Sequence, residues 1–229
     1  MSRSKEEQLY SAAYRGELEK VKSLCSDPDL KINWQLEGGF TSLSVACHGG
    51  HVGVVKYLLS LKGIDPNKPA NKGSTPLFMA CANGHKEVVS LLLADPRIDP
   101  NKPKNDQSTP LWYASQEGHL VVVQHLLASG REIDTKMKST FNNKTAFEHG
   151  KAMGIRKKDQ DIAPVGKSET EDEYKLSKFN GPLCADLIDA YEKDPATVSS
   201  QLRKQLGPRG ISSHSPFPVV FKITRCLFG

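Results

Sequence analysis

Three histidines, His51, His85 and His119, recur at intervals of 34 residues and are the first candidates for metal binding or acid–base catalysis. Histidine titrates near neutral pH and binds zinc at about 2.1 Å. If the interval reflects stacked helical units, equivalent rings lie about 10 Å apart, so two of them cannot reach one zinc ion. We therefore expect each ring to stand at the start of a helix and to bond between neighbouring units, and we predict no metal site.

The cysteines are the next candidates, for disulfides, zinc binding or nucleophilic catalysis. They are Cys25, Cys47, Cys81, Cys184 and Cys226. Their number is odd and no two have C-x-x-C spacing, which argues against a disulfide scaffold or a zinc ribbon and favours a reducing compartment. Cys47 and Cys81 share a repeated position that otherwise holds alanine or serine, so we expect buried small side chains rather than nucleophiles.

Other chemical patterns are weak. Two Asp-Pro-Asn sequences, at 65–67 and 99–101, are similar to the start of a calcium-binding loop. They lack the glycine and the closing glutamate of an EF-hand and recur at the interval of the histidines, so we interpret them as turns. The chain contains no glycine-rich phosphate loop and no Ser/His/Asp spacing typical of a hydrolase. We predict a protein without catalytic residues and without a cofactor.

The composition excludes several classes of protein. The 229 residues are 38% hydrophobic and 25% charged, which argues against a wholly disordered chain. The net charge of +5 is too small to indicate a DNA-binding or membrane-surface protein. Because the sequence has no long apolar run and no apolar N-terminal segment, we expect a soluble cytoplasmic protein, and the basic residues 156–158 leave a nuclear location open.

A sequence repeat of 34 residues indicates the structural elements that position these residues. Segments that begin at Thr41, Thr75 and Thr109 share Thr-x-Leu-x-x-Ala, and Gly-His follows nine residues after each threonine. A Val-Val-x-x-Leu-Leu sequence then follows each Gly-His pair. An internal repeat of this length indicates stacked units that share one continuous core.

The residue types within one unit predict a helix, a tight turn and a second helix. Thr75 is suited to cap the first helix, and Pro76 is suited to its first turn. Gly84 can adopt the positive φ that ends this helix. Apolar side chains at helical spacing in 77–81 and 88–93 give each helix one face to bury. The Pro-, Asn- and Lys-containing residues 95–108 predict a projecting turn.

This pattern resembles the ankyrin repeat family. The residues that carry the resemblance are Thr41, Thr75, Pro76, Gly84, His85, Thr109, Pro110, Gly118 and His119. The chain departs from the family pattern at Ser42, which replaces proline, and at Ser44, Phe78 and Trp112, which replace the usual histidine. The resemblance implies an all-α ankyrin-repeat solenoid of stacked helix-turn-helix units with projecting turns, and a role in protein interaction without catalysis.

The repeat and its decay predict the organisation of the chain. We expect the array at 1–154, with units near 6–34, 40–67, 74–101 and 108–135 and a partial unit at 144–154. The polar residues 155–180 predict a mobile insertion. Apolar residues at helical spacing predict a helix pair over 181–207 that completes and caps the array, with Pro182 at the start of its first helix. Residues 208–229 are expected to form an irregular tail.

In such a solenoid the remaining candidates for function lie on the surface. We predict a concave groove formed by the first helices and the turn tips, with the partner-binding residues Val45, Met79, Trp112, Tyr113 and Gln116. Aromatic and methionine side chains are enriched where proteins bind one another. The tips at 68–73 and 102–107 would place four lysines around the groove, namely Lys68, Lys72, Lys102 and Lys104. The alternative for Phe78 and Trp112 is packing between units.

These features predict a monomeric protein-interaction module or adaptor that binds a protein or peptide through the groove and the tips. A preformed surface lowers the ordering cost of association. The alternative is binding of a nucleic acid or another acidic surface by the lysine-bearing tips, although the small net charge argues against nucleic acid. We expect no membrane partner.

Overall fold

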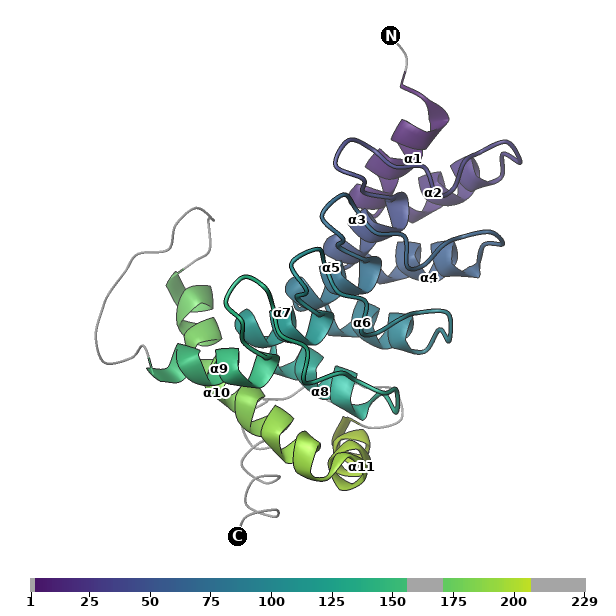
Figure 1. Ribbon diagram of the computed structural model, residues 1–229. Helices are drawn as coiled ribbons and strands as arrows, with labels where there is room; N and C mark the ends of the chain where they lie inside the picture. Colours follow the sequence, from purple (N-terminus) through teal and green to yellow (C-terminus); the bar gives the residue numbers. More distant parts are fainter. Residues whose placement is uncertain (1–2, 156–170, 207–229) are drawn as a thin grey trace.

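The computed structural model describes residues 3–155 and 171–206, and it shows helical hairpins laid side by side in a row (Figure 1). The expected tail at 208–229 and much of the expected insertion at 155–180 lie outside these residues. Within the described ranges, none of the helices combines the length and the apolar character that a membrane span requires.

Two rows of helices form the stack, and the described residues contain no β-strand. The inner row consists of α1 (Lys5–Tyr14), α3 (Ser42–His48), α5 (Pro76–Ala82), α7 (Pro110–Gln116) and α9 (Ala146–Ile155). The outer row consists of α2 (Leu18–Cys25), α4 (Val52–Ser60), α6 (Lys86–Leu93) and α8 (Leu120–Ala128). Consecutive helices of each row are in contact, and α1, α3, α5 and α7 each pack on the outer helix that follows them. The all-α solenoid predicted from the repeat is confirmed.

Threonine caps start the inner helices of the repeat. The side-chain hydroxyl of Thr75 accepts a hydrogen bond from the backbone N–H of Phe78 at 3.1 Å, and Thr109 bonds in the same way to the N–H of Trp112 at 3.1 Å. Such a bond satisfies one of the free N–H groups in the first turn of a helix. In α3, Thr41 and Ser44 bond each other reciprocally, so that Ser44 closes a capping box.

The core runs along the whole stack between the two rows. Its inner-helix leucines are Leu43, Leu77 and Leu111, and its outer-helix leucines are Leu58, Leu92 and Leu126, each at most 2% exposed. Burying one such side chain contributes about 1.5–3 kcal/mol. Because equivalent positions recur in each unit, neighbouring units complete one another's core and hold the inner helices in a fixed register.

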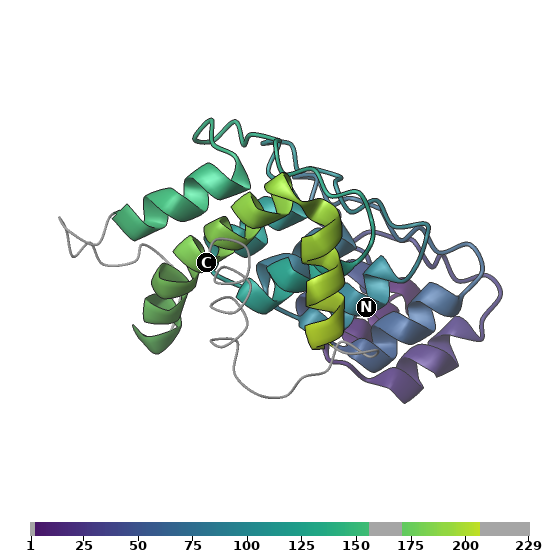
Figure 2. The same ribbon diagram turned by 90° about the horizontal axis from the view of Figure 1, so that it is seen from below.

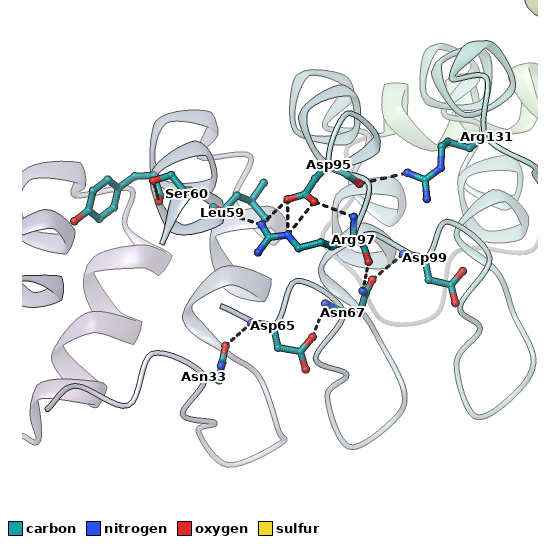
Figure 3. Close-up of polar contacts among 10 residues, drawn as sticks. Asn33, Leu59, Ser60, Asp65, Asn67, Asp95, Arg97, Asp99 and Arg131 are labelled. Atoms are coloured by element: carbon teal, nitrogen blue, oxygen red, sulfur yellow. Dashed lines mark hydrogen bonds and ion pairs between the residues drawn. The ribbon is translucent and has the colours of Figure 1, made fainter. Parts of the chain in front are cut away.

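Asparagine side chains join the turns that follow the outer helices (Figure 3). Asn67 donates from Nδ2 to the carbonyl oxygen of Arg97 at 2.6 Å and accepts at Oδ1 from the backbone N–H of Asp99 at 2.9 Å. The equivalent pairs of bonds are made by Asn33 and Asn101. The carboxylates of Asp65 and Asp99 accept from the N–H two residues further on, which is an Asx turn. The Asp-Pro-Asn sequences therefore serve as turns that link units.

Arginine side chains bind the ends of the outer helices on the same side. Arg97 donates to a carbonyl oxygen in the last turn of α4 at 2.8 Å, while three hydrogen bonds to the carboxylate of Asp95 hold its guanidinium in place. Arg131 donates to three carbonyl oxygens around the end of α6. The last helix supplies Arg203, whose Nη1 lies 3.4 Å from the carbonyl oxygen of Ala128 in α8. Arg203 therefore repeats, on α8, the contact that Arg97 makes on α4.

Helices α9, α10 (Glu171–Lys193) and α11 (Pro195–Leu206) close the C-terminal end of the stack (Figure 2). Helix α9 packs on α7, α10 lies along α9 and also contacts α7 and α8, and α11 packs on α8. The structure differs from the expectation at the start of α10, which lies at Glu171 rather than near residue 181, with Pro182 inside the helix. A helix tolerates an internal proline when packing offsets the lost hydrogen bond, and α9 lies alongside α10 here.

Candidate functional site

The repeated histidines stand at the starts of α4, α6 and α8 and do not converge. Their Nε2 atoms lie 2.8–3.1 Å from backbone carbonyl oxygens of the preceding unit, which belong to Tyr14, His48 and Ala82. A carbonyl oxygen only accepts hydrogen bonds, so each Nε2 carries the proton and donates it. The rings of His51, His85 and His119 thereby join neighbouring units, and a protonated Nε2 offers no lone pair to a metal.

The described cysteines are not suited to nucleophilic catalysis. Cys47, Cys81 and Cys184 are fully buried, and burial raises the pKa of each thiol far above its usual value. Cys25 is partly buried, and burial raises the pKa of its thiol to about 11. Because the thiolate is the reactive form, these thiols stay inert near neutral pH. In residues 3–155 and 171–206, no group of three or more His, Cys, Asp or Glu side chains is placed to hold a metal ion.

An aromatic cluster spans the inner helices α5, α7 and α9. The rings of Tyr113 and Phe78 meet in an edge-to-face arrangement at a centroid distance of 4.8 Å, and the ring of Tyr113 lies 5.8 Å from that of Trp112. The ring of Trp112 stacks on His149 at 4.7 Å. Tyr113 stays partly exposed, and its partial burial, together with the charges of nearby carboxylates, raises the pKa of its phenol. Tyr113 therefore presents a neutral aromatic ring with a hydroxyl donor.

Two of the residues expected to line the groove are buried. Trp112 is 2% exposed, and its Nε1 donates to the carbonyl oxygen of Lys144 at 3.0 Å, in the segment that leads into α9. Val45 is 4% exposed, because its short side chain does not extend beyond the core. Neither side chain is accessible to a partner. Phe78 is 4% exposed, which agrees with the alternative expectation that it packs between units. Met79 and Gln116 remain partly exposed on α5 and α7.

The lysines expected around the groove lie in the tips but differ in their contacts. The Nζ of Lys104 lies 5.1 Å from the ring centroids of both Phe78 and Tyr113 and 3.4 Å from a carboxylate oxygen of Asp106. Lys102 donates to a backbone carbonyl oxygen of the preceding tip at 3.3 Å. Lys72 is exposed and Lys68 is partly exposed. Lys104 therefore belongs to the aromatic cluster, whereas Lys68, Lys72 and Lys102 are placed to meet a partner.

Four tip hairpins, residues 33–40, 67–74, 101–108 and 136–144, stand in a row beside the inner helices (Figure 1). Each is closed by a backbone hydrogen bond between its two arms. Neighbouring hairpins are joined by the N–H groups of Asn71, Asn105 and Thr140, each of which donates to a carbonyl oxygen of the preceding hairpin. The row is therefore a connected edge, held in place by main-chain bonds between units.

The fourth tip hairpin carries a feature that sequence reasoning missed. Its closing bond joins Ser139 to Lys144, five positions apart, whereas Lys104 and Ser108 in the third are four apart. Phe141 follows Thr140 at the apex, and so occupies the position that Lys72 has after Asn71 in the second hairpin. The side chain of Phe141 is 83% exposed. The sequence does contain one indication of this longer hairpin, because Thr109 and Thr145 are 36 residues apart, whereas the other repeats are 34 residues apart.

His149 on α9 was also missed. It follows Thr145 at the spacing of Met79 after Thr75, so it occupies the same place in the inner row. The side-chain Nδ2 of Asn142, in the fourth tip hairpin, lies 2.8 Å from Nδ1 of His149. The ring of Trp112 stacks on the imidazole of His149. The partly exposed inner-row positions thus run Met79, Tyr113 and His149 from α5 to α9. We use the name inner face for these side chains together with Gln116.

Comparison with known proteins agrees with this architecture. A family model described as ankyrin repeats (three copies) matches residues 3–70 and 61–137. No curated protein shows a significant match to the chain.

Proposed function

Because the chain belongs to the ankyrin repeat family, whose repeats are general protein–protein interaction modules, we propose that it is a non-catalytic adaptor that binds a protein or peptide through its inner face and its tip hairpins. The observation that carries this proposal is the run of partly exposed side chains on the inner face. Met79 and Tyr113 are of the types enriched at the centres of protein interfaces.

The rigidity of the stack supports the proposal. Asparagine bonds between turns, histidine bonds between units and main-chain bonds between tip hairpins fix the spacing of the units. A surface that is already ordered spends little of its binding free energy on ordering, so a modest contact area gives useful affinity. Partner specificity would then lie in the inner face and the tip hairpins rather than in the repeated core residues.

The chemistry of the reactive side chains also fits a binding role. The repeated histidines are engaged in bonds between units, and the described cysteines are buried with raised pKa values. Free thiols fit a reducing compartment such as the cytoplasm, which we propose as the location, and we propose a monomer as the binding form. The second candidate function, nucleic-acid binding, is favoured only by the lysines of the tip hairpins.

An affinity pull-down with the full chain tests the proposal. We expect the double variant Met79→Ala/Tyr113→Ala to lose most of the captured partner, and partner identity is read by mass spectrometry. The matched control is Leu91→Ala/Tyr57→Ala, which removes an aliphatic and an aromatic side chain of similar partial exposure from the outer row. Because Tyr113 contacts Phe78, the Tm of each variant is measured beside its capture. Equal loss of partner in both double variants, or no partner with the wild-type chain, would refute the proposal.

A further inference from the structure

The tip hairpins concentrate the positive charge of the molecule. They contain seven lysines and two carboxylates, a net charge of +5, which equals the formal net charge of the whole chain. The lysines are Lys68, Lys72, Lys102, Lys104, Lys136, Lys138 and Lys144, and the carboxylates are Glu37 and Asp106. The rest of the chain is therefore neutral on balance, and an acidic partner is attracted to this one edge.

Four of these lysines make no ion pair within the described part of the chain, although the charge of Lys144 acts on the nearby carboxylate of Glu148. Three others are paired, Lys104 with Asp106, Lys136 with Glu192 and Lys138 with Glu148. Lys68, Lys72, Lys102 and Lys144 make no ion pair with a described residue, and Lys72 is exposed. These ammonium groups can pair with carboxylates of a partner without first breaking a pair within the chain.

Phe141 adds an apolar contact to the same edge. It is the most exposed large hydrophobic side chain of the described residues, at 83%, and it stands between Lys138 and Lys144 in one tip hairpin. The backbone N–H of Phe141 donates to the hydroxyl of Ser139 at 3.2 Å, which fixes the apex that carries the ring. An exposed aromatic side chain on an ordered turn gains free energy by covering its ring with an apolar side chain of a partner.

Two acidic residues on the edge favour a partner with spaced charges over a nucleic acid. The tip hairpins contain no arginine, so the anionic groups of any partner would meet single lysine ammonium groups. The edge also holds Glu37 and Asp106, which would repel a backbone that carries a charge at every nucleotide. In an acidic peptide the charges stand only at chosen positions, so such a peptide can avoid these two carboxylates.

The spacing of the units sets the spacing of the charges. Neighbouring helices pack about 8–10 Å apart, and an extended peptide advances about 3.3 Å per residue, so every third residue of a bound peptide meets the next unit. Lys68 and Lys102 stand at equivalent positions of neighbouring units. We infer that the partner segment is an extended acidic peptide with carboxylates at every third position and a large apolar residue that packs on Phe141. This inference rests on the proposed function, because it names the chemistry of the partner at the same surface.

Fluorescence anisotropy with the full chain tests the inference at about 50 mM salt. The probe is a labelled 13-residue peptide with Leu at its centre and Glu at the third and sixth positions on both sides, so that either chain direction presents the same pattern, with serine and asparagine elsewhere. The expected result is saturable binding that weakens at least tenfold when the four glutamates become glutamine. A peptide of the same composition with its glutamates adjacent should bind several-fold more weakly.

Variants locate the binding edge. We expect Lys72→Gln/Lys102→Gln and, separately, Phe141→Ala to weaken binding of the probe about fivefold. The matched controls, Lys56→Gln/Lys62→Gln on the outer side and Tyr14→Ala on α1, should leave it within twofold. They remove equal charge and another exposed aromatic ring elsewhere on the molecule. All these side chains are partly or fully exposed, so the fold is retained and a Tm measurement confirms it.

The outcomes separate the inference from the function on which it rests. Absence of binding to the wild-type chain, equal binding of the glutamine peptide, or indifference to both tip variants would overturn the inference. Tighter binding of a 12-nucleotide single strand, lost in Lys72→Gln/Lys102→Gln, would overturn it in favour of nucleic acid. A third outcome is that capture of a protein is lost in Met79→Ala/Tyr113→Ala but the glutamate peptide does not displace that protein. The proposed function would then be retained, and the inference of an acidic partner segment would be wrong.

Discussion

Gly50 and the imidazole of His85 pack so closely that a Cβ on Gly50 would lie 2.7 Å from Nδ1 of the ring. The same ring donates from Nε2 to the carbonyl oxygen of His48 at 2.8 Å, so it bonds the end of α3 while it covers the glycine. The repeated glycine therefore has two tasks. It adopts a positive φ of 70° after α3, and it leaves room for the histidine of the next unit.

This relationship predicts that Gly50→Ala destabilises the protein more than Gly63→Ala. Gly63 has a similar positive φ of 85° but nothing within 4 Å of an added Cβ, so the control carries the backbone strain alone. We expect a loss of about 1 kcal/mol for Gly63→Ala and a further 1–3 kcal/mol for Gly50→Ala, because the histidine must shift. Urea unfolding measures both. Equal losses would show that the contact with His85 adds no strain.

The repeat determines which residues form helices, but not which side chains of the inner row reach the surface. Thr75, Pro76 and Gly84 could be assigned from sequence because capping, first-turn proline and positive φ are local properties of the chain. The burial of Trp112 is not local. Its indole N–H bonds to the carbonyl oxygen of Lys144, in an irregular segment whose path the repeat does not specify. Its position alone therefore suggested exposure.

The C-terminal part was harder to predict for a related reason. Pro182 marked the start of a helix in the sequence, because proline is favoured in a first turn. In the structure the helix continues through Pro182, and packing of α10 on α9, a contact between distant segments, accompanies it. The exposure of Phe141 was also hard to predict from the sequence. It depends on one additional residue within the fourth tip hairpin, and the length of the repeat does not show where that residue lies.

A second prediction concerns the asparagine bonds between turns. Asn67→Asp keeps the acceptor for the N–H of Asp99 but replaces the donor that bonds to the carbonyl oxygen of Arg97 with a carboxylate oxygen. We expect the free energy of unfolding to fall by about 0.5–1.5 kcal/mol, the net contribution of a typical hydrogen bond, because this bond is exposed to solvent. Asn71→Asp is the control, because it adds the same charge on an exposed residue of the tip. A similar loss in both variants would mean that charge, not the bond, is responsible.

A third prediction concerns the shared core. Leu92 is fully buried in α6, and Leu92→Ala should lower the free energy of unfolding by about 2–5 kcal/mol through lost apolar contacts and a cavity. Val52→Ala in α4, where the side chain is 40% exposed, should change it by about 0.5 kcal/mol or less. Because the units share one core, hydrogen exchange in Leu92→Ala should also rise in α4 and α8. A rise confined to α6 would contradict the continuous core.

The last prediction concerns the pH dependence of stability at His125 of α8, which is 7% exposed. The hydroxyl of Ser90 lies 2.7 Å from its Nδ1, and burial, followed by the charge of Lys86, lowers the pKa of the imidazole. A lowered pKa means that, below the ordinary histidine pKa of about 6.5, the unfolded chain takes up a proton that the folded chain refuses. The free energy of unfolding should therefore fall as pH drops from about 7 to 5. We expect a smaller fall in the free energy of unfolding for His125→Leu, measured by urea titrations at pH 5, 6 and 7. Leucine is chosen because α6 has Leu91 at the equivalent position. The other histidines are common to both proteins, so equal pH dependence would show that His125 is not the group responsible.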